Sequence, residues 1–185
     1  MHLQLEVRCL LQYLEQQVQL EHFILRKGLF QLMEQGLYTP MGEKDAVERT
    51  AAMYRILTKA GINVIRVGLK SSDIMSDGHN TAETFHPAFR QLVEGLIARQ
   101  DLEMQIDNIL QLYRQSHMTC PGIALISNEK CRNNLFGHKS ENKHYFKNKY
   151  DKISFDYLID SQAGMSLKDG EYLAVCISDI KDKII

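Results

Sequence analysis

The sequence contains few cysteines, and none of them forms a closely spaced pair. They lie far apart, without a Cys-x-x-Cys pair, at Cys9, Cys120, Cys131 and Cys176. A zinc ribbon or a cluster-binding loop needs closely spaced thiolates, so neither is encoded here. We expect the four thiols to be structural, in a reducing compartment.

The sequence also lacks a long apolar run and an excess of charge of either sign. No segment approaches the roughly 18 apolar residues that span a bilayer. The first residues have neither the basic head nor the apolar core of a signal peptide. We therefore expect a cytoplasmic protein without a membrane partner. The formal net charge of -1 gives no general attraction to nucleic acid, so any charged partner must be recognised by a local patch.

What remains is an ordinary globular composition. The 185 residues, 44% of them hydrophobic and 24% charged, suffice for one domain or for one domain with a small module. Ile62, Val64, Ile65 and Val67 are β-branched and predict a buried strand over 62–69. The apolar spacing predicts a helix over 45–59 before it, with Gly61 at the helix end. A helix leading into a buried strand is typical of parallel α/β sheets and barrels.

The rest of the chain follows the same periodicities. The patterns predict one or two helices over 3–35, a helix after Pro87 that runs to 115 with a break near 99–101, a strand at 123–126, a helix over 129–136 capped by Asn128, a helix over 139–150, and strands at 153–159 and 172–177. The turn-forming run 116–122 is the best candidate for a domain boundary. Residues 119–185 therefore form a small α+β module.

That module is locally basic. Between Glu129 and Lys152 it has seven Lys and Arg residues against three acidic ones. A turn at 137–140 between two helices, with free backbone amides and Lys139, suits a phosphate. The alternative, an ordinary glycine-terminated helix beside a solvated basic helix, is more typical of such a segment. Tyr145 and Phe146 are more typical of core residues than of base-stacking ones. The candidate nucleic-acid-binding residues are Gly137, His138, Lys139, Asn142 and Lys143.

Four segments in order resemble one protein family: Gly36-Leu37-Tyr38-Thr39-Pro40, then 60–70, then Phe85-His86-Pro87-Ala88-Phe89-Arg90 and onward to Glu94, and finally Asn128 with 135–142. They are similar to the C-terminal part of radical SAM proteins related to the catalytic subunit of Elongator. The bacterial members are labelled oxygen-independent coproporphyrinogen III oxidase-like. The resemblance extends from about Gly28 to Ser178.

The resemblance implies a fold and a cofactor. The fold is α/β, with the last strand-helix units of a partial (β/α) barrel in residues 1–118, followed by the small module. Residues 62–69 are then a late barrel strand, and Ile65 and Val67 need cover from residues 3–33 or from another chain. The whole family protein binds a [4Fe-4S] cluster and S-adenosylmethionine through a Cys-x-x-x-Cys-x-x-Cys-like loop. This chain lacks that loop, so we expect it to be inactive alone, without a cofactor of its own.

Two residues near the predicted strand are candidates for cofactor contact, Arg66 and Gly68. On a strand they share a face, where Arg66 suits a cofactor or substrate carboxylate, or else pairs with Asp73 or extends to solvent. Gly68 either allows close approach of a ligand or ends the strand. His86 fits a helix cap better than acid-base work, and His79 is a weak loop candidate.

Two functions from different classes follow. In the first, the chain closes a radical SAM barrel and helps place the substrate, with the missing N-terminal barrel as its partner. In the second, it is a stand-alone RNA- or anion-binding module that uses the basic helices of residues 128–150, with tRNA as a partner.

Overall fold

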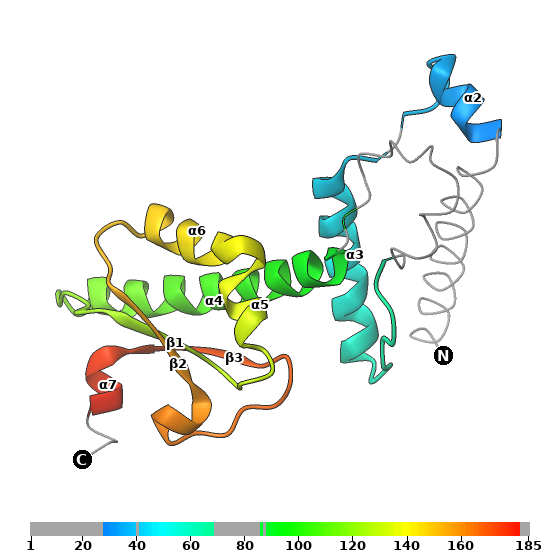
Figure 1. Ribbon diagram of the computed structural model, residues 1–185. Helices are drawn as coiled ribbons and strands as arrows, with labels where there is room; N and C mark the ends of the chain where they lie inside the picture. Colours follow the sequence, from blue (N-terminus) through cyan, green and yellow to red (C-terminus); the bar gives the residue numbers. More distant parts are fainter. Residues whose placement is uncertain (1–27, 40, 69–85, 87, 182–185) are drawn as a thin grey trace. The chain divides into compact units, whose positions relative to one another are not determined.

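The computed structural model describes residues 28–39, 41–68, 86 and 88–181, and the chain divides into two compact units, 1–87 and 88–185 (Figure 1). Helix α4, Phe89–Gln115, packs against strand β3, Tyr172–Cys176, and helix α5, Arg132–Phe136, and thus belongs to the second unit. The chain therefore divides between residues 87 and 88, whereas we expected a boundary after 118. No helix in the described ranges is both long and apolar enough to cross a bilayer.

The first unit contains helices α2, Gly28–Glu34, and α3, Glu43–Lys59. Helix α3 confirms the helix predicted over 45–59, with Val47, Ala51 and Leu57 buried. Its C-terminus is closed by Gly61, whose φ of 75° lets its N–H bond to Thr58 and the N–H of Ile62 bond to Leu57. Helix α2 falls within the helical stretch predicted over 3–35, of which 3–27 lie outside the described residues.

The strand predicted over 62–69 is wrong for its described part. Residues 62–67 have no regular secondary structure, and Ile65 is 86% exposed. β-branched residues only indicate that a segment suits a pleated, half-buried surface; the hydrogen bonds and the burial must come from a neighbouring strand. The sheet formed by the described residues does not include 62–67, and the run is not a strand.

In the second unit, α4 is one continuous helix of 27 residues, so the break predicted near 99–101 is also wrong. Ala98, Leu102 and Ile106 are fully buried and continue one apolar stripe through that point. Neither Pro nor Gly occurs between Arg99 and Asp101, so nothing in the backbone interrupts the helix.

A three-stranded sheet forms the centre of this unit. Strand β1, Ile123–Ser127, lies between β2, Phe155–Ile159, to which it is parallel, and the antiparallel β3. The three strands confirm those predicted at 123–126, 153–159 and 172–177. The connection from β1 to β2 contains α5, the short helix η2, His138–Ser140, and helix α6, Glu141–Lys149. Asn128 accepts a hydrogen bond from the Cys131 N–H at 2.9 Å in the turn before α5.

Each face of the sheet has its own core, because successive residues of β1 point to opposite sides. Ile123 and Leu125 pack with α4, α5 and α6, which cover one face (Figure 1). Ala124 and Ile126 pack instead with the short helix η3, Asp160–Ala163, and helix α7, Ile177–Lys181. The result is a mixed α/β unit whose basic connection, α5 to α6, lies on a well-supported face.

Candidate nucleic-acid interface

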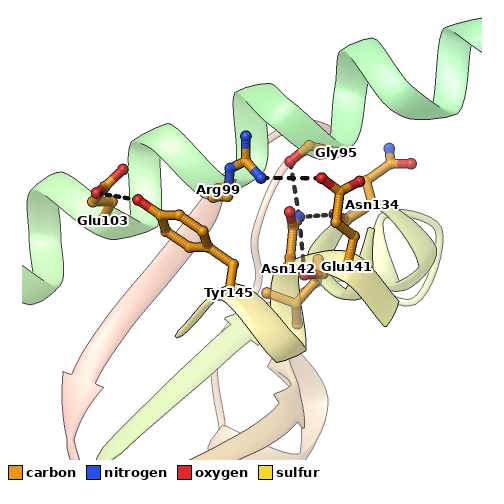
Figure 2. A network of polar contacts seen from close by, with 8 residues as sticks. Gly95, Arg99, Glu103, Asn134, Glu141, Asn142 and Tyr145 are labelled. Carbon is orange, nitrogen blue, oxygen red and sulfur yellow. Dashed lines mark hydrogen bonds and ion pairs between the residues drawn. The ribbon is translucent and has the colours of Figure 1, made fainter. Parts of the chain in front are cut away.

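The turn between α5 and α6 is held from beneath by Asn142. Its side chain, 2% exposed, donates from Nδ2 to the carbonyl oxygens of Gly95 at 2.8 Å, Asn134 at 3.1 Å and Leu135 at 3.4 Å (Figure 2). These bonds join α6 to the N-terminal part of α4 and to two of the last carbonyls of α5. Asn142 therefore supports the turn from inside and does not present its amide to a ligand.

The turn also depends on two glycines. Gly137 has a φ of 74°, and a Cβ placed on it would lie 2.9 Å from Asn142 Cγ. A Cβ on Gly95 would lie 3.4 Å from the Cα of Gly137. Helix α4 and the turn can approach this closely only because both residues lack a side chain. Gly137, one of the predicted nucleic-acid-binding residues, is thus buried and serves the packing.

After Gly137 the chain turns sharply to enter α6. Lys139 and Ser140 both have left-handed backbone angles, with φ of 50° and 63°. Such angles in non-glycine residues cost free energy and are retained where the surrounding fold imposes them. Here the Asn142 contacts impose them, and the consequence is that the exposed Lys139 is held at the head of α6 beside the half-buried His138.

A second set of polar contacts fixes α6 along α4. Arg99 pairs with Glu141 at 3.3 Å and its guanidinium lies 4.7 Å from the ring centre of Tyr145 (Figure 2). Tyr145 donates to Glu103 at 2.7 Å, and Lys149 also pairs with Glu103. Burial alone would raise the pKa of Glu103, but the bonds from Lys149 and Tyr145 lower it below its ordinary value.

The aromatic residues of α6 serve the core, as their more typical role predicted. Phe146 is fully buried and Tyr145 is bonded to α4. Neither ring is available as a base-stacking surface, and Lys149 is occupied by Glu103 and Asp107.

Most of the remaining lysines around α6 have no counter-ion. Lys139, Lys143, Lys147 and Lys152 are exposed and form no ion pair with any described residue. Lys143 and Lys147 are one helical turn apart, and residues at this spacing have Cβ atoms about 5–6 Å from each other. Neighbouring lysines without counter-ions attract a polyanion more strongly than the net charge of the chain suggests.

Beside these lysines lies a row of alternating character, which we call the cation-aromatic row: Arg132, Phe136, Tyr157 and Lys143. The Arg132 guanidinium is 5.6 Å from the ring centre of Phe136, whose ring lies 5.2 Å from that of Tyr157. Lys143 Nζ is 5.7 Å from the Tyr157 ring centre. Both rings are half-buried and both cations are exposed. Burial raises the pKa of the Tyr157 hydroxyl to about 12, so it remains neutral.

Three members of this row were not among the residues predicted to bind nucleic acid. Arg132 and Phe136 are one turn apart in α5, but Tyr157 comes from β2, and no local pattern joins it to them. Only the packing of α5 and α6 over the parallel pair of strands brings the four side chains together. Of the predicted residues, Lys143 belongs to the row and is exposed, as is Lys139, whereas Gly137 and Asn142 are buried.

The candidates of the first unit are not brought together in this way. Arg66 and Gly68 are both exposed in a segment without strand pairing, and Gly68 has a φ of 79°. His86 is half-buried, while His79 and Asp73 lie outside the described residues. Cofactor contact by Arg66 and Gly68 stays a prediction.

Comparisons with protein-family models, curated proteins and solved structures found no match to this chain.

Proposed function

We propose that residues 88–185 form an RNA-binding module and that the surface around α6 is its contact face. The observation that carries the proposal is the cation-aromatic row together with the unpaired lysines Lys139, Lys143 and Lys147. The side chains of lysines neutralise phosphates, and unstacked bases pack on aromatic rings or on the plane of a guanidinium. The rings supply no base-edge code, so binding is tolerant of sequence.

The alternative is that the chain completes a radical SAM barrel and helps to place a substrate. This alternative needs a barrel strand at 62–69 with Arg66 directed at the ligand. Residues 62–67 are not a strand and Arg66 is exposed, whereas the RNA-binding proposal uses only side chains whose positions are described. We therefore prefer the RNA-binding proposal, and tRNA, the partner expected from the sequence, is the probe for it.

The test measures the salt dependence of tRNA binding by fluorescence anisotropy. If Lys139, Lys143 and Lys147 each neutralise a phosphate of an unpaired strand, log K falls with log salt at a slope of about -2, and affinity drops about 20-fold between 50 and 200 mM. Lys143→Ala then reduces the slope by about 0.7. Salt-independent binding, or no binding, overturns the proposal.

Two further variants locate the contact. Lys168→Ala removes the same charge from an exposed loop next to Leu167, which packs on the opposite face of the sheet, and leaves the slope unchanged. Phe136→Leu keeps an apolar side chain in α5 but removes the ring. It weakens binding by about 1–3 kcal/mol without changing the slope, because a stacking contact releases no counter-ion. Equal effects of Lys143→Ala and Lys168→Ala contradict the proposed location.

A further inference from the structure

Two cysteines of the second unit lie against each other at the end of the sheet opposite the turn that precedes α5. Cys176 ends β3 and is 2% exposed, and Cys120 precedes β1 and is 8% exposed. Their sulfur atoms are 3.9 Å apart. Ile123 is the residue opposite Cys176 in the β1–β3 ladder, so the backbone near both cysteines is held by strand pairing. Neither thiol takes part in the proposed RNA-binding surface.

Hydroxyl groups surround only one of the two sulfur atoms. Tyr113 donates to Cys176 Sγ at 2.9 Å, and Ser178 Oγ lies 3.0 Å from the same sulfur. Burial would raise the pKa of Cys176, but the bonds from Ser178 and Tyr113 lower it below its ordinary value. Burial raises the pKa of Cys120, whose sulfur contacts the Gly122 carbonyl oxygen at 3.5 Å. The two thiols are therefore chemically different, although they are neighbours.

Several residues around the pair are open to solvent. Tyr113 and Ser178 are themselves partly exposed, and residues 116–119, which lead into Cys120, are exposed. A small oxidant reaches such a site through local opening of the covering side chains. The sulfur atoms must close from 3.9 Å to about 2 Å for a disulfide to form.

We propose that Cys176 and Cys120 form a peroxide-sensitive pair that is oxidised to a disulfide. The Cys176 thiolate attacks one oxygen of hydrogen peroxide, the O–O bond breaks, and hydroxide leaves and takes up a proton to give water. Cys176 is then a sulfenic acid. The Cys120 sulfur attacks the Cys176 sulfur, the S–S bond forms, the S–O bond of the sulfenic acid breaks, and its hydroxyl group leaves with the Cys120 proton as water. In sum, two thiols and one peroxide give one disulfide and two waters.

The remaining described cysteine provides an internal control. Cys131 is also buried, and its sulfur contacts the Tyr172 hydroxyl and accepts a bond from the Gly170 N–H at 3.2 Å, but no other described thiol lies against it. If burial alone protected thiols, Cys131 and Cys176 would react equally slowly. If the neighbouring thiol matters, Cys176 reacts first and pairs with Cys120.

The experiment treats the whole chain with hydrogen peroxide, blocks the remaining thiols and maps the peptides by mass spectrometry. The expected product is a Cys120–Cys176 peptide pair with a loss of about 2 Da, formed before Cys131 is modified. Absence of that pair, or a mixture of pairings with Cys9 and Cys131, overturns the proposal. Because this measurement uses the unaltered chain, its outcome does not depend on the folding of a variant.

Two variants test the separate roles. Cys120→Ala leaves Cys176 as a sulfenic acid that dimedone traps, since no thiol remains beside it to expel water. Tyr113→Phe slows disulfide formation about threefold or more, because Cys176 loses a hydrogen bond that stabilises its thiolate and is ionised less often. The remaining thiolate is intrinsically more nucleophilic, but this gain offsets only part of the loss. An unchanged rate in Tyr113→Phe, or no trapping in Cys120→Ala, contradicts the proposed order of steps.

Discussion

Replacing Asn142 by Asp tests whether the turn before α6 is held by a buried amide. The change keeps the shape of the side chain but replaces the Nδ2 donor by an oxygen. That oxygen would face three carbonyl oxygens, of which Gly95 lies at 2.8 Å and Asn134 at 3.1 Å. An ionised carboxylate finds no donor there and is buried beside like partial charges.

The expected loss can be worked from the contacts. The amide has two hydrogens, so it contributes two hydrogen bonds worth about 1 kcal/mol each. Asn134 O keeps a bond from the Gly137 N–H at 3.2 Å, whereas Leu135 O has no hydrogen-bond donor other than Asn142 among the described residues. An unsatisfied buried carbonyl costs about 1–3 kcal/mol. Asn142→Ala should therefore lose about 3 kcal/mol, and Asn142→Asp at least as much at pH 7.

The assay is urea unfolding followed by circular dichroism, at pH 7 and again at lower pH. The site favours the protonated carboxyl, which can donate one bond, so the pKa of the new Asp is raised in the folded state. Its penalty is thus full above that pKa and diminishes as the pH falls, while the penalty of Asn142→Ala does not change. Asn148→Asp, exposed on the same helix, is the matched control and should change stability by less than about 0.5 kcal/mol. A loss of less than about 0.5 kcal/mol in Asn142→Asp at pH 7 refutes the reasoning.

Three further changes test other parts of the second unit by the same unfolding assay. Gly137→Ala should lower the free energy of unfolding by about 3 kcal/mol or more, because a φ of 74° with a ψ of 170° is essentially confined to glycine and the Cβ would meet Asn142. Gly164→Ala, where no atom lies near the added Cβ, should lower it by only about 1 kcal/mol. Equal losses in the two variants would contradict this reasoning. His117→Gly should stabilise by about 0.5 kcal/mol, since His117 closes α4 with a φ of 52°, and a destabilisation would show that its ring contributes more than its backbone costs. Glu103→Gln should make the free energy of unfolding depend less on pH in acid. The pKa of Glu103 is lowered in the folded state, so its contribution to stability is present above the unfolded pKa and is lost as the pH falls through the folded pKa. An unchanged pH dependence would contradict the bonds from Lys149 and Tyr145 as the cause of the lowered pKa.

Several features were predictable because they depend on residues close in sequence. The helix over 45–59 follows from apolar spacing, and its end at Gly61 follows from the conformational freedom of glycine. The strands near 123–126, 153–159 and 172–177 follow from short β-branched and aromatic runs between turn residues. Lys139 and Lys143 were recognised from a local excess of basic residues, and the structure places both at the surface.

Other features depended on partners that local sequence does not specify. The run 62–67 has the composition of a strand, yet a strand exists only where a neighbour pairs with it. Asn142 and Gly137 belong to the same local motif as Lys139, but the approach of α4 at Gly95 places them inside the fold.

The sequence by itself determined most of the helices and strands of the second unit and where positive charge accumulates, because periodicity, turn residues and charge are local properties. The tertiary structure alone decided that β2 and β3 flank β1 and that Arg132, Phe136, Tyr157 and Lys143 form one row. The same holds for the Cys120–Cys176 contact, which joins residues 56 positions apart. Such contacts follow from how whole elements bury their apolar faces against each other, and many local sequences satisfy that requirement equally well.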